Sequence, residues 1–124
     1  MILADTSIWV DHLRAGDNQL GELLDSGRVL GHPFVTGELA LGHLRQRDLI
    51  LRSLMELPQA VVASDHEVLQ LINQEQMFAR GIGYVDAHLI AAVRLTPEAW
   101  LWTRDTRLHA AAVGVGLALT RSGC

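Results

Sequence analysis

The sequence has few reactive side chains and no long apolar run. Among its 124 residues it has one cysteine, Cys124, and no lysine. A single cysteine excludes a disulfide framework within the chain and a cysteine-rich zinc site, and it fits a reducing, cytoplasmic environment. Charged residues interrupt each apolar run well before the ~18 residues that a membrane-spanning helix needs. Residues 1–5 reach an acid at once and carry no basic segment, so we expect no secretory signal there.

The charge balance is acidic, with 14 acids against ten basic residues and a formal net charge of −4. All ten basic residues are arginine, a side chain that contacts phosphate and carboxylate groups in a bidentate manner. An acidic chain is at first sight a poor binder of nucleic acid. However, four of the acids are candidate ligands of a cation, as described below. Setting them aside leaves ten acids against ten arginines, so the net charge does not exclude a nucleic-acid substrate.

Short apolar runs alternate with helical patterns along the chain, and 49% of its residues are hydrophobic. This order predicts one α/β domain over residues 1–124, with three layers (α/β/α) and a central parallel sheet of about five short strands. The expected strands cover residues 2–4, 28–31, 59–63, 100–103 and 117–119. The expected helices cover residues 8–13, 18–26, 33–41, 44–57, 64–79, 86–95 and 107–113.

Sites in such sheets lie outside the carboxyl ends of the strands, and several acids are placed near that edge. Asp5 directly follows the first expected strand, and Asp105 follows the fourth by two residues. Glu38 has mostly apolar neighbours at helical spacing, so we expect its side chain to point toward the core. Asp86 opens a helix that has an apolar face. A buried carboxylate without a partner costs several kcal/mol, which makes a partner or a metal ion necessary.

Each of these acids also has a purely structural explanation. Asp5 and Asp86 could cap the helices that follow them, Asp105 could lie in an Asx-turn, and Glu38 could pair with an arginine. If the topology gathers all four at one edge, their mutual repulsion raises their pKa values. A hard divalent cation with oxygen ligands removes that repulsion, and Mg²⁺ or Mn²⁺ is the natural occupant.

Four blocks of the sequence, in order, resemble the PIN-domain toxins of the VapC family. The blocks are MILADTSIWVD at residues 1–11, Glu38-Leu39, GYVDAHLIAA at residues 83–92 and WTRDTRL at residues 102–108. The resemblance covers nearly the whole chain. It implies a PIN-like fold and a Mg²⁺- or Mn²⁺-dependent endoribonuclease that cleaves RNA. It also implies a cognate VapB-type antitoxin as partner and a homodimer of the toxin.

The resemblance assigns the four acids to the catalytic and metal-binding residues of that family. We expect Asp5 and Asp86 to be the inner metal ligands. Glu38 and Asp105 are expected to hold a second ion or to orient water as bases. Phosphodiester hydrolysis needs an activated water and relief of negative charge on the phosphate, and one or two divalent cations can supply both.

Four further residues are candidates for substrate binding or support. Thr103 and Ser7 match small hydroxyl residues of the family, and they could hydrogen-bond the phosphate or fix the rotamer of an aspartate. Ordinary capping and turn contacts explain the same two hydroxyls. Arg104 and Arg107 lie nearest to the expected site in sequence and are candidate contacts of RNA phosphates.

Two other functions belong to different classes. A phosphoacceptor receiver domain also binds Mg²⁺ at the acidic edge of a parallel sheet. It requires paired acids after the first strand and a lysine near its end, and this chain has no lysine. A PIN-like module that only binds a partner is the second alternative, although it has no need of four intact acids. Metal dependence of RNA cleavage distinguishes both from the nuclease.

Overall fold

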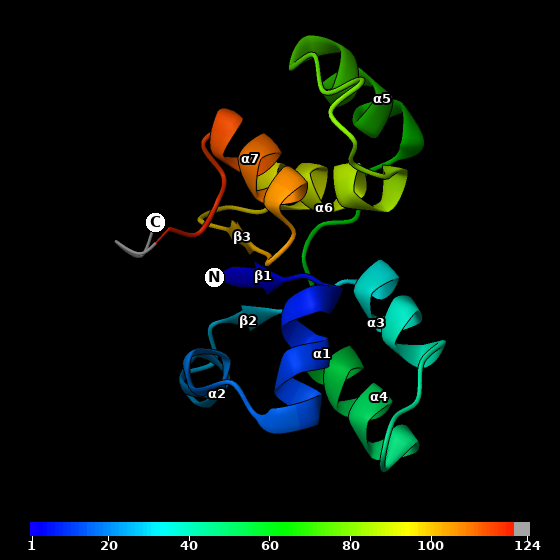
Figure 1. Cartoon of the computed structure of the whole chain (residues 1–124), viewed down its shortest axis with the longest axis vertical. Helices are drawn as coiled ribbons and strands as arrows, with labels where there is room; N and C mark the ends of the chain where they lie inside the picture. The colour runs from blue at the N-terminus through cyan, green and yellow to red at the C-terminus, as the bar shows by residue number, and fades with distance from the viewer. Residues whose placement is uncertain (121–124) are drawn as a thin grey trace.

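The computed structural model describes residues 1–120 and shows a small parallel sheet surrounded by helices (Figure 1). The sheet contains β1 (Ile2–Ala4), β2 (Val29–Leu30) and β3 (Trp100–Trp102), in the order β2–β1–β3. The helices of this part of the chain are α1 (Thr6–Ala15), α2 (Asn18–Asp25), α3 (Pro33–Ala40), α4 (Arg47–Glu56), α5 (Asp65–Gln74), α6 (Tyr84–Leu95) and α7 (Thr106–Gly114). Cys124 lies outside the described residues.

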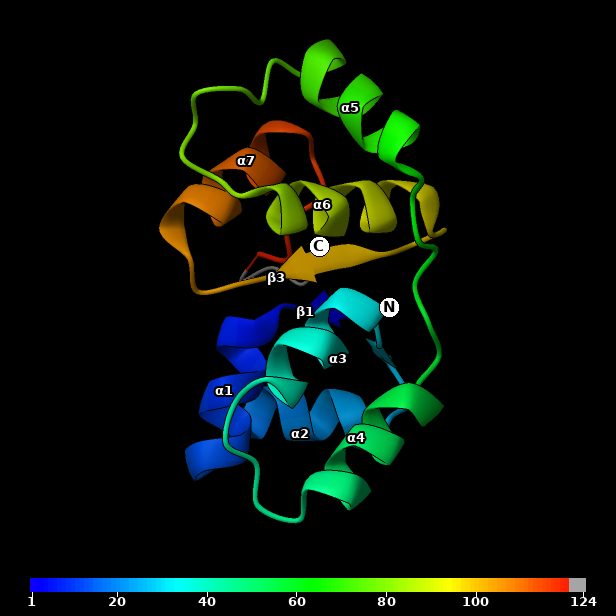
Figure 2. The same ribbon diagram turned by 90° about the vertical axis from the view of Figure 1, so that its right-hand side faces the viewer.

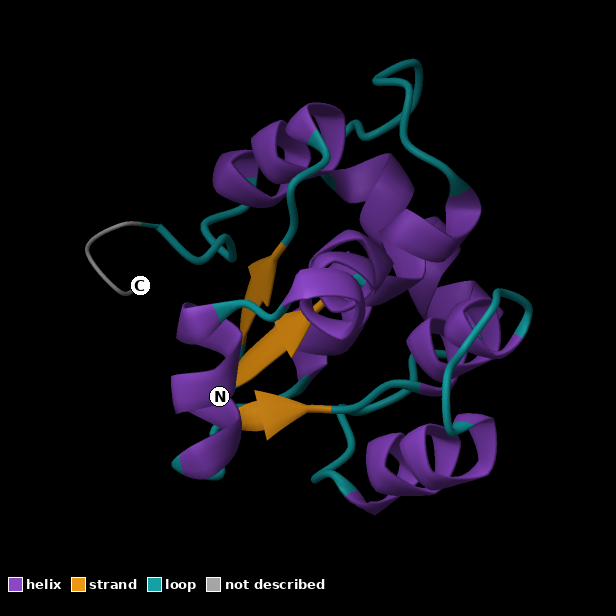
Figure 3. Ribbon diagram, turned by 60° about the horizontal axis from the view of Figure 1, so that its bottom comes forward, coloured by secondary structure: helices purple, strands orange, loops and turns teal. Residues whose placement is uncertain are grey.

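The central strand β1 forms the core together with the helices on both sides of the sheet. Helices α5, α6 and α7 gather on the side of β3, and α1 to α4 gather on the side of β2 (Figure 2). All three residues of β1 are buried, as an apolar strand covered on both faces must be. Figure 3 shows the strands in the middle of the molecule with helices around them, which confirms the expected α/β class.

Two of the five expected strands do not form as named strands. Residues 59–63 contribute one parallel bridge, between Gly31 and Gln59, and residues 117–119 contribute one between Leu101 and Ala118. Each segment runs beside the sheet for a single pair of residues. The prediction of strands at residues 59–63 and 117–119 was therefore wrong, and the described sheet has three strands where about five were expected.

Two helices are shorter than the apolar spacing suggested. Helix α4 begins at Arg47 and not at residue 44, because Gln46 has a left-handed backbone with φ of 52°. Helix α5 ends at Gln74, since Gln76 has φ of 51° and Ala79 has φ of 62°. A left-handed residue cannot continue a right-handed helix, so both boundaries follow from backbone geometry that apolar spacing does not encode.

The strand order predicts a functional site at the carboxyl end of β1. The chain goes from β1 to β2 on one side and then returns past β1 to β3 on the other. The carboxyl end of β1 therefore lies at the point where the order of the strands reverses, where sites of open α/β sheets occur. Asp5 occupies that point, and its backbone N–H donates to the carbonyl of Trp102 at 3.0 Å. No helix among residues 1–120 has the length and apolar character needed to cross a membrane.

Candidate active site

Asp5 is held rigidly at the edge of the sheet. Its side chain is buried, 6% exposed, and it caps the N-terminus of α1. One carboxylate oxygen, Oδ1, accepts hydrogen bonds from Ser7 Oγ at 2.5 Å and from the N–H of Ile8 at 3.3 Å. The other oxygen, Oδ2, accepts from Thr103 Oγ1. The expected capping role is therefore confirmed, and the same contacts fix the rotamer of the carboxylate at the sheet edge.

Thr103 connects Asp5 to Asp105. Its buried hydroxyl donates to Asp5 and accepts from the N–H of Asp105 at 3.0 Å. Asp105 caps α7, with Oδ1 accepting from the N–H groups of Arg107 at 2.9 Å and Leu108 at 3.1 Å. These two bonds use one oxygen of an exposed side chain. The cap thus orients Asp105 and leaves its second oxygen facing solvent.

Asp86 reaches the same region from the third position of α6. Its side chain is half-buried, and Oδ2 accepts from the N–H of Gly83 at 3.2 Å. The expected role of Asp86 as a first-turn acid is confirmed by this contact, which secures the start of the helix. One residue thus supports the helix and carries a candidate metal-binding carboxylate.

Glu38 does not point toward the core, and that expectation was wrong. Its side chain is exposed, and Oε1 accepts from Thr6 Oγ1 at 2.7 Å. The neighbours Val35 and Leu39 are the buried residues of α3. Helix α3 is short and has apolar residues on several sides, so the spacing alone did not identify which side is buried. The contact with Thr6 ties Glu38 to the residue that follows Asp5.

The other three acids lie close enough to Asp86 to act on its pKa. The pKa of Asp86 is raised, first because burial disfavours the charged form. The N–H of Gly83 acts in the opposite direction, and the negative charges of Asp105, Asp5 and Glu38 then add to the increase. Residues from four separate segments therefore form one acidic group, and we call Asp5, Glu38, Asp86 and Asp105 the carboxylate cluster.

The donors of the carboxylate cluster suit a hard divalent cation, because all of them are oxygen atoms of carboxylates. Among residues 1–120, however, no three His, Cys, Asp or Glu side chains are placed closely enough to share one ion. Burial first, and then the charges of the other three carboxylates, raise the pKa of Asp86, and both effects disfavour its ionised form in the absence of a counter-charge. The cluster therefore fits such a cation by the chemistry of its donors, without forming a finished coordination shell.

The two candidate arginines precede and follow Asp105 in the sequence, and their side chains have different surroundings. The guanidinium of Arg104 donates to Asp11 Oδ2 at 2.7 Å and to Asp17 Oδ2 at 2.5 Å. The side chain of Arg107 lies against Gly81, where an added Cβ would be 2.9 Å from its Cδ and Nη1 atoms. Contact of either arginine with an RNA phosphate stays a prediction.

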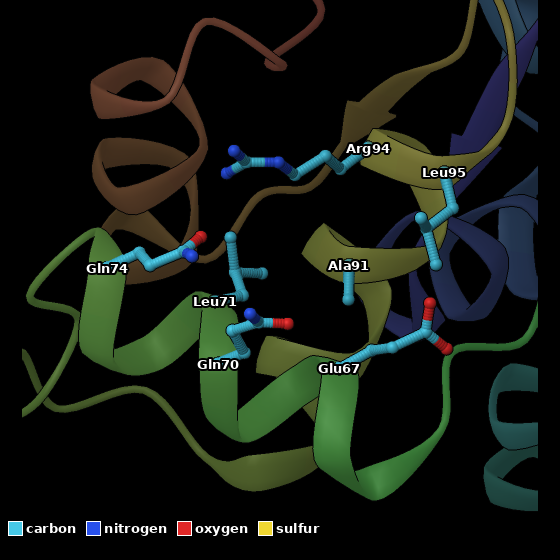
Figure 4. Close-up of a pocket in the computed structure, with 7 residues that line it drawn as sticks. All are labelled: Glu67, Gln70, Leu71, Gln74, Ala91, Arg94 and Leu95. Carbon is cyan, nitrogen blue, oxygen red and sulfur yellow. The ribbon is translucent and has the colours of Figure 1, made fainter.

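A groove of about 620 Å³ begins at Glu38 and Thr6 and runs between α1, α3 and the segment before α4. Its walls combine apolar and basic side chains, which include Val10, Leu39, Ile50, Arg14 and Arg45. A smaller pocket of about 120 Å³ lies between α5 and α6 (Figure 4). None of the four acids lines that second pocket, so the groove is the cavity that adjoins the carboxylate cluster.

Comparison with known proteins decides the family. Residues 2–114 match the PIN domain family. The chain is a PIN-domain protein. This PIN domain is also 49% identical over 119 residues to proteins described as "Ribonuclease VapC32" from Mycobacterium tuberculosis strains CDC 1551 / Oshkosh and ATCC 25618 / H37Rv. Each alignment covers 96% of this chain and 96% of the relative. The PIN domain therefore belongs to the VapC ribonucleases, as the four sequence blocks indicated.

The sequence analysis missed three polar residues that this PIN domain uses near the site. Thr6 binds Glu38, and Asp11 and Asp17 bind Arg104. Thr6 and Asp11 lie inside the first block of resemblance, so their position near the site could have been inferred from that block. Asp17 is recognisable in the sequence only as a helix cap, and its Oδ1 does accept from the N–H of Leu20 at 2.9 Å.

Proposed function

We propose that this chain is a metal-dependent endoribonuclease and the toxin of a VapBC-type toxin–antitoxin pair. Membership of the VapC family makes it a ribonuclease, a hydrolase of RNA phosphodiester bonds. The observation that supports the metal-dependent mechanism most strongly is the gathering of Asp5, Glu38 and Asp105 near the half-buried Asp86, whose pKa is raised first by burial and then by their charges. Residues 1–124 act as a single domain in this proposal, and the protein works in the cytoplasm.

Asp5 and Asp86 would hold the cation, Mg²⁺ or Mn²⁺. When bound, such a cation supplies charge stabilisation for the phosphodiester and for an activated water. Asp5 contributes a carboxylate whose rotamer is fixed by Ser7 and Thr103, so little ordering is needed when a ligand arrives. Asp86 contributes a half-buried carboxylate that an opposite charge would stabilise, because burial disfavours its ionised form.

Glu38 and Asp105 would complete the site from its exposed side. Both side chains are accessible to solvent, and each has one oxygen engaged with a group of the protein. Their free oxygens can hold a second cation or orient the attacking water and accept its proton. Ser7 and Thr103 position Asp5, while Arg104 and Arg107 flank Asp105.

The proposed partners are RNA, a VapB-type antitoxin and a second copy of the chain. The groove beside Glu38 offers an antitoxin segment an apolar surface that leads to the carboxylate cluster. A basic side chain of the antitoxin, placed among the carboxylates, would compete with the cation and block RNA. Val10 in the wall of the groove and Leu41 near it are exposed apolar side chains, and pairing with another chain would cover them.

Substitution of the two inner acids tests this function. Asp5→Asn and Asp86→Asn should each reduce cleavage of an RNA oligonucleotide in Mn²⁺ more than about 100-fold, because several kcal/mol of charge stabilisation depend on them. Asp25→Asn, which changes an exposed carboxylate at the end of α2, is the matched control and should cleave normally. Circular dichroism checks that each variant is folded.

Near-normal turnover by a folded variant at either position contradicts the assignment. A wild-type protein that is inactive on every RNA tested, with or without Mn²⁺, and yet binds an antitoxin supports the alternative of a non-catalytic PIN-fold module.

A further inference from the structure

Arg104 joins three segments beside the carboxylate cluster. It follows β3, and its guanidinium donates to Asp11 on α1 and to Asp17, the cap of α2. These partners are 93 and 87 residues away in the sequence. The same guanidinium lies 5.8 Å from the centroid of the Trp102 ring, within the range of a cation–π contact. Arg104 therefore fixes the segment after β3 against the first two helices.

The backbone of Arg104 leads directly to Asp5. Its N–H donates to Ser7 Oγ at 3.0 Å, and the Ser7 hydroxyl donates to Asp5 Oδ1 at 2.5 Å. The two neighbours of Arg104 in the chain are Thr103, which donates to Asp5, and Asp105, a member of the carboxylate cluster. A shift of this short segment would therefore move two of the four acids relative to each other.

The surroundings of Arg104 are poorly suited to recruit a phosphate. Its positive charge is opposed by two carboxylates, Asp11 and Asp17, and Asp11 also lies 3.4 Å from Arg14. Two arginines and two aspartates leave no surplus positive charge. The pKa of Asp17 is lowered, first by the hydrogen bond from the N–H of Leu20 and also by Arg104, so this carboxylate stays charged. Contact with a phosphate would require Arg104 to break two ion pairs.

We propose that Arg104 is a positioning residue for RNA cleavage, and that its ion pairs with Asp11 and Asp17 set the placement of Asp5 and Asp105. The proposal rests on the proposed function, because the placement matters only if these acids act on RNA. Loss of the Arg104 side chain should therefore change turnover and metal affinity clearly, and the free energy of unfolding only slightly. Ion pairs this exposed contribute little to folding, since the side chain of Arg104 is 44% accessible.

Arg104→Ala provides the first measurement, with Arg94→Ala as the matched control. Arg94 forms an ion pair of 3.0 Å with Glu75, its side chain is also 44% exposed, and it extends over the pocket between α5 and α6 (Figure 4). Arg104→Ala should lower kcat on an RNA oligonucleotide about 10-fold or more and raise the Mn²⁺ concentration for half-maximal thermal stabilisation by a similar factor. KM for RNA should change less than twofold, and Arg94→Ala should match the wild type in all three quantities.

Asp17→Asn gives the second measurement. Asparagine retains the cap of α2 but loses the charge that binds Arg104. Positioning predicts that Asp17→Asn lowers kcat in the same direction as Arg104→Ala. It also predicts that the double variant is no worse than Arg104→Ala alone, because the two residues act as one unit. Arg104→Lys, which can keep one ion pair, should restore part of the lost kcat.

Two results would overturn the proposal. If Arg104 binds a phosphate, Arg104→Ala raises KM, weakens the salt dependence of kcat/KM, and Asp17→Asn improves binding by releasing the guanidinium. If Arg104 has a merely structural role, the Tm falls while kcat and metal affinity at low temperature match the wild type. If Arg104→Ala has the kcat of the wild type and Asp5→Asn is inactive, only the positioning role of Arg104 is rejected. If both variants have wild-type activity, the proposed function is rejected as well.

Discussion

Replacing Asp86 with asparagine should stabilise the metal-free protein, although it removes a proposed metal ligand. The carboxylate of Asp86 is half-buried, and the charges of Asp105, Asp5 and Glu38 repel it. Asparagine keeps an oxygen that can accept the hydrogen bond from the N–H of Gly83. The substitution therefore removes repulsion and desolvation of a charge while it retains the contact that secures the start of α6.

The expected gain is about 1 kcal/mol. Each repulsion between partly exposed carboxylates is worth a few tenths of a kcal/mol, and three of them act on Asp86. In a domain of 124 residues, this gain corresponds to a rise in Tm of roughly 2–6 °C. The gain depends on pH because the pKa of Asp86 is raised above its ordinary value. It is fully present above the raised pKa and shrinks as the pH falls through it, where the wild-type carboxyl takes up a proton.

Urea denaturation in EDTA, at pH values from 4 to 8, measures this difference. Glu22→Gln is the matched control, because it also removes one negative charge, from an exposed side chain of α2. The control should change the free energy of unfolding by less than about 0.5 kcal/mol. If Asp86→Asn is equal to or less stable than the wild type in EDTA at pH 7, the carboxylates do not destabilise one another and the reasoning fails.

Three further predictions concern residues around the site. Burial and the charge of His88 lower the pKa of His32 to about 4. The wild type should therefore lose stability as the pH falls from 6.5 toward 4, because the unfolded chain takes up a proton there and the folded chain does not. His32→Asn, which can still cap α3, should reduce the change in the free energy of unfolding by up to about 1.4 kcal/mol per pH unit, and an unchanged pH dependence would contradict the lowered pKa. Thr103→Val should lower the free energy of unfolding by about 2 kcal/mol, since it removes the hydroxyl between Asp5 and Asp105, whereas Thr103→Ser should recover most of the loss in urea denaturation. Glu38→Gln should weaken binding of the antitoxin in a calorimetric titration, and the loss of affinity should shrink as the salt concentration rises. An affinity that changes with neither the substitution nor the salt concentration would place the antitoxin contact on apolar surfaces alone.

Three of the five expected strands, and the positions of Asp5 and Asp105 after two of them, could be predicted because their signals are local. Ile2–Ala4 is a short apolar run, and Asp5 must lie at the end of β1 once that strand forms. The order of apolar runs and helices then indicated a parallel sheet, whose carboxyl edge carries Asp5 and Asp105. Glu38 and Asp86 were identified from their apolar neighbours at helical spacing and then matched the acids of the VapC family, but their proximity to Asp5 became visible only in three dimensions.

Other features depend on contacts or backbone states that no local pattern encodes. The left-handed Gln46 delays α4 beyond the apolar spacing. Glu38 was expected to face the core because α3 is rich in apolar residues, and only packing decides which of them are buried. Arg104 was a candidate contact of RNA phosphates in the sequence, which gave no sign that its side chain pairs with acids of α1 and of the start of α2.

The most direct test of the metal-dependent site is a titration of the wild type with Mn²⁺ after treatment with EDTA, with RNA cleavage and the melting curve recorded on the same sample. A cation that binds the folded cluster and not the unfolded chain should stabilise the protein, by about 2.7 kcal/mol at 100 times its Kd. If the carboxylate cluster binds Mn²⁺ for catalysis, cleavage and Tm should rise together, and Asp5→Asn should lose both responses. Cleavage that persists in EDTA, with identical melting curves in EDTA and Mn²⁺, would contradict a metal-dependent site.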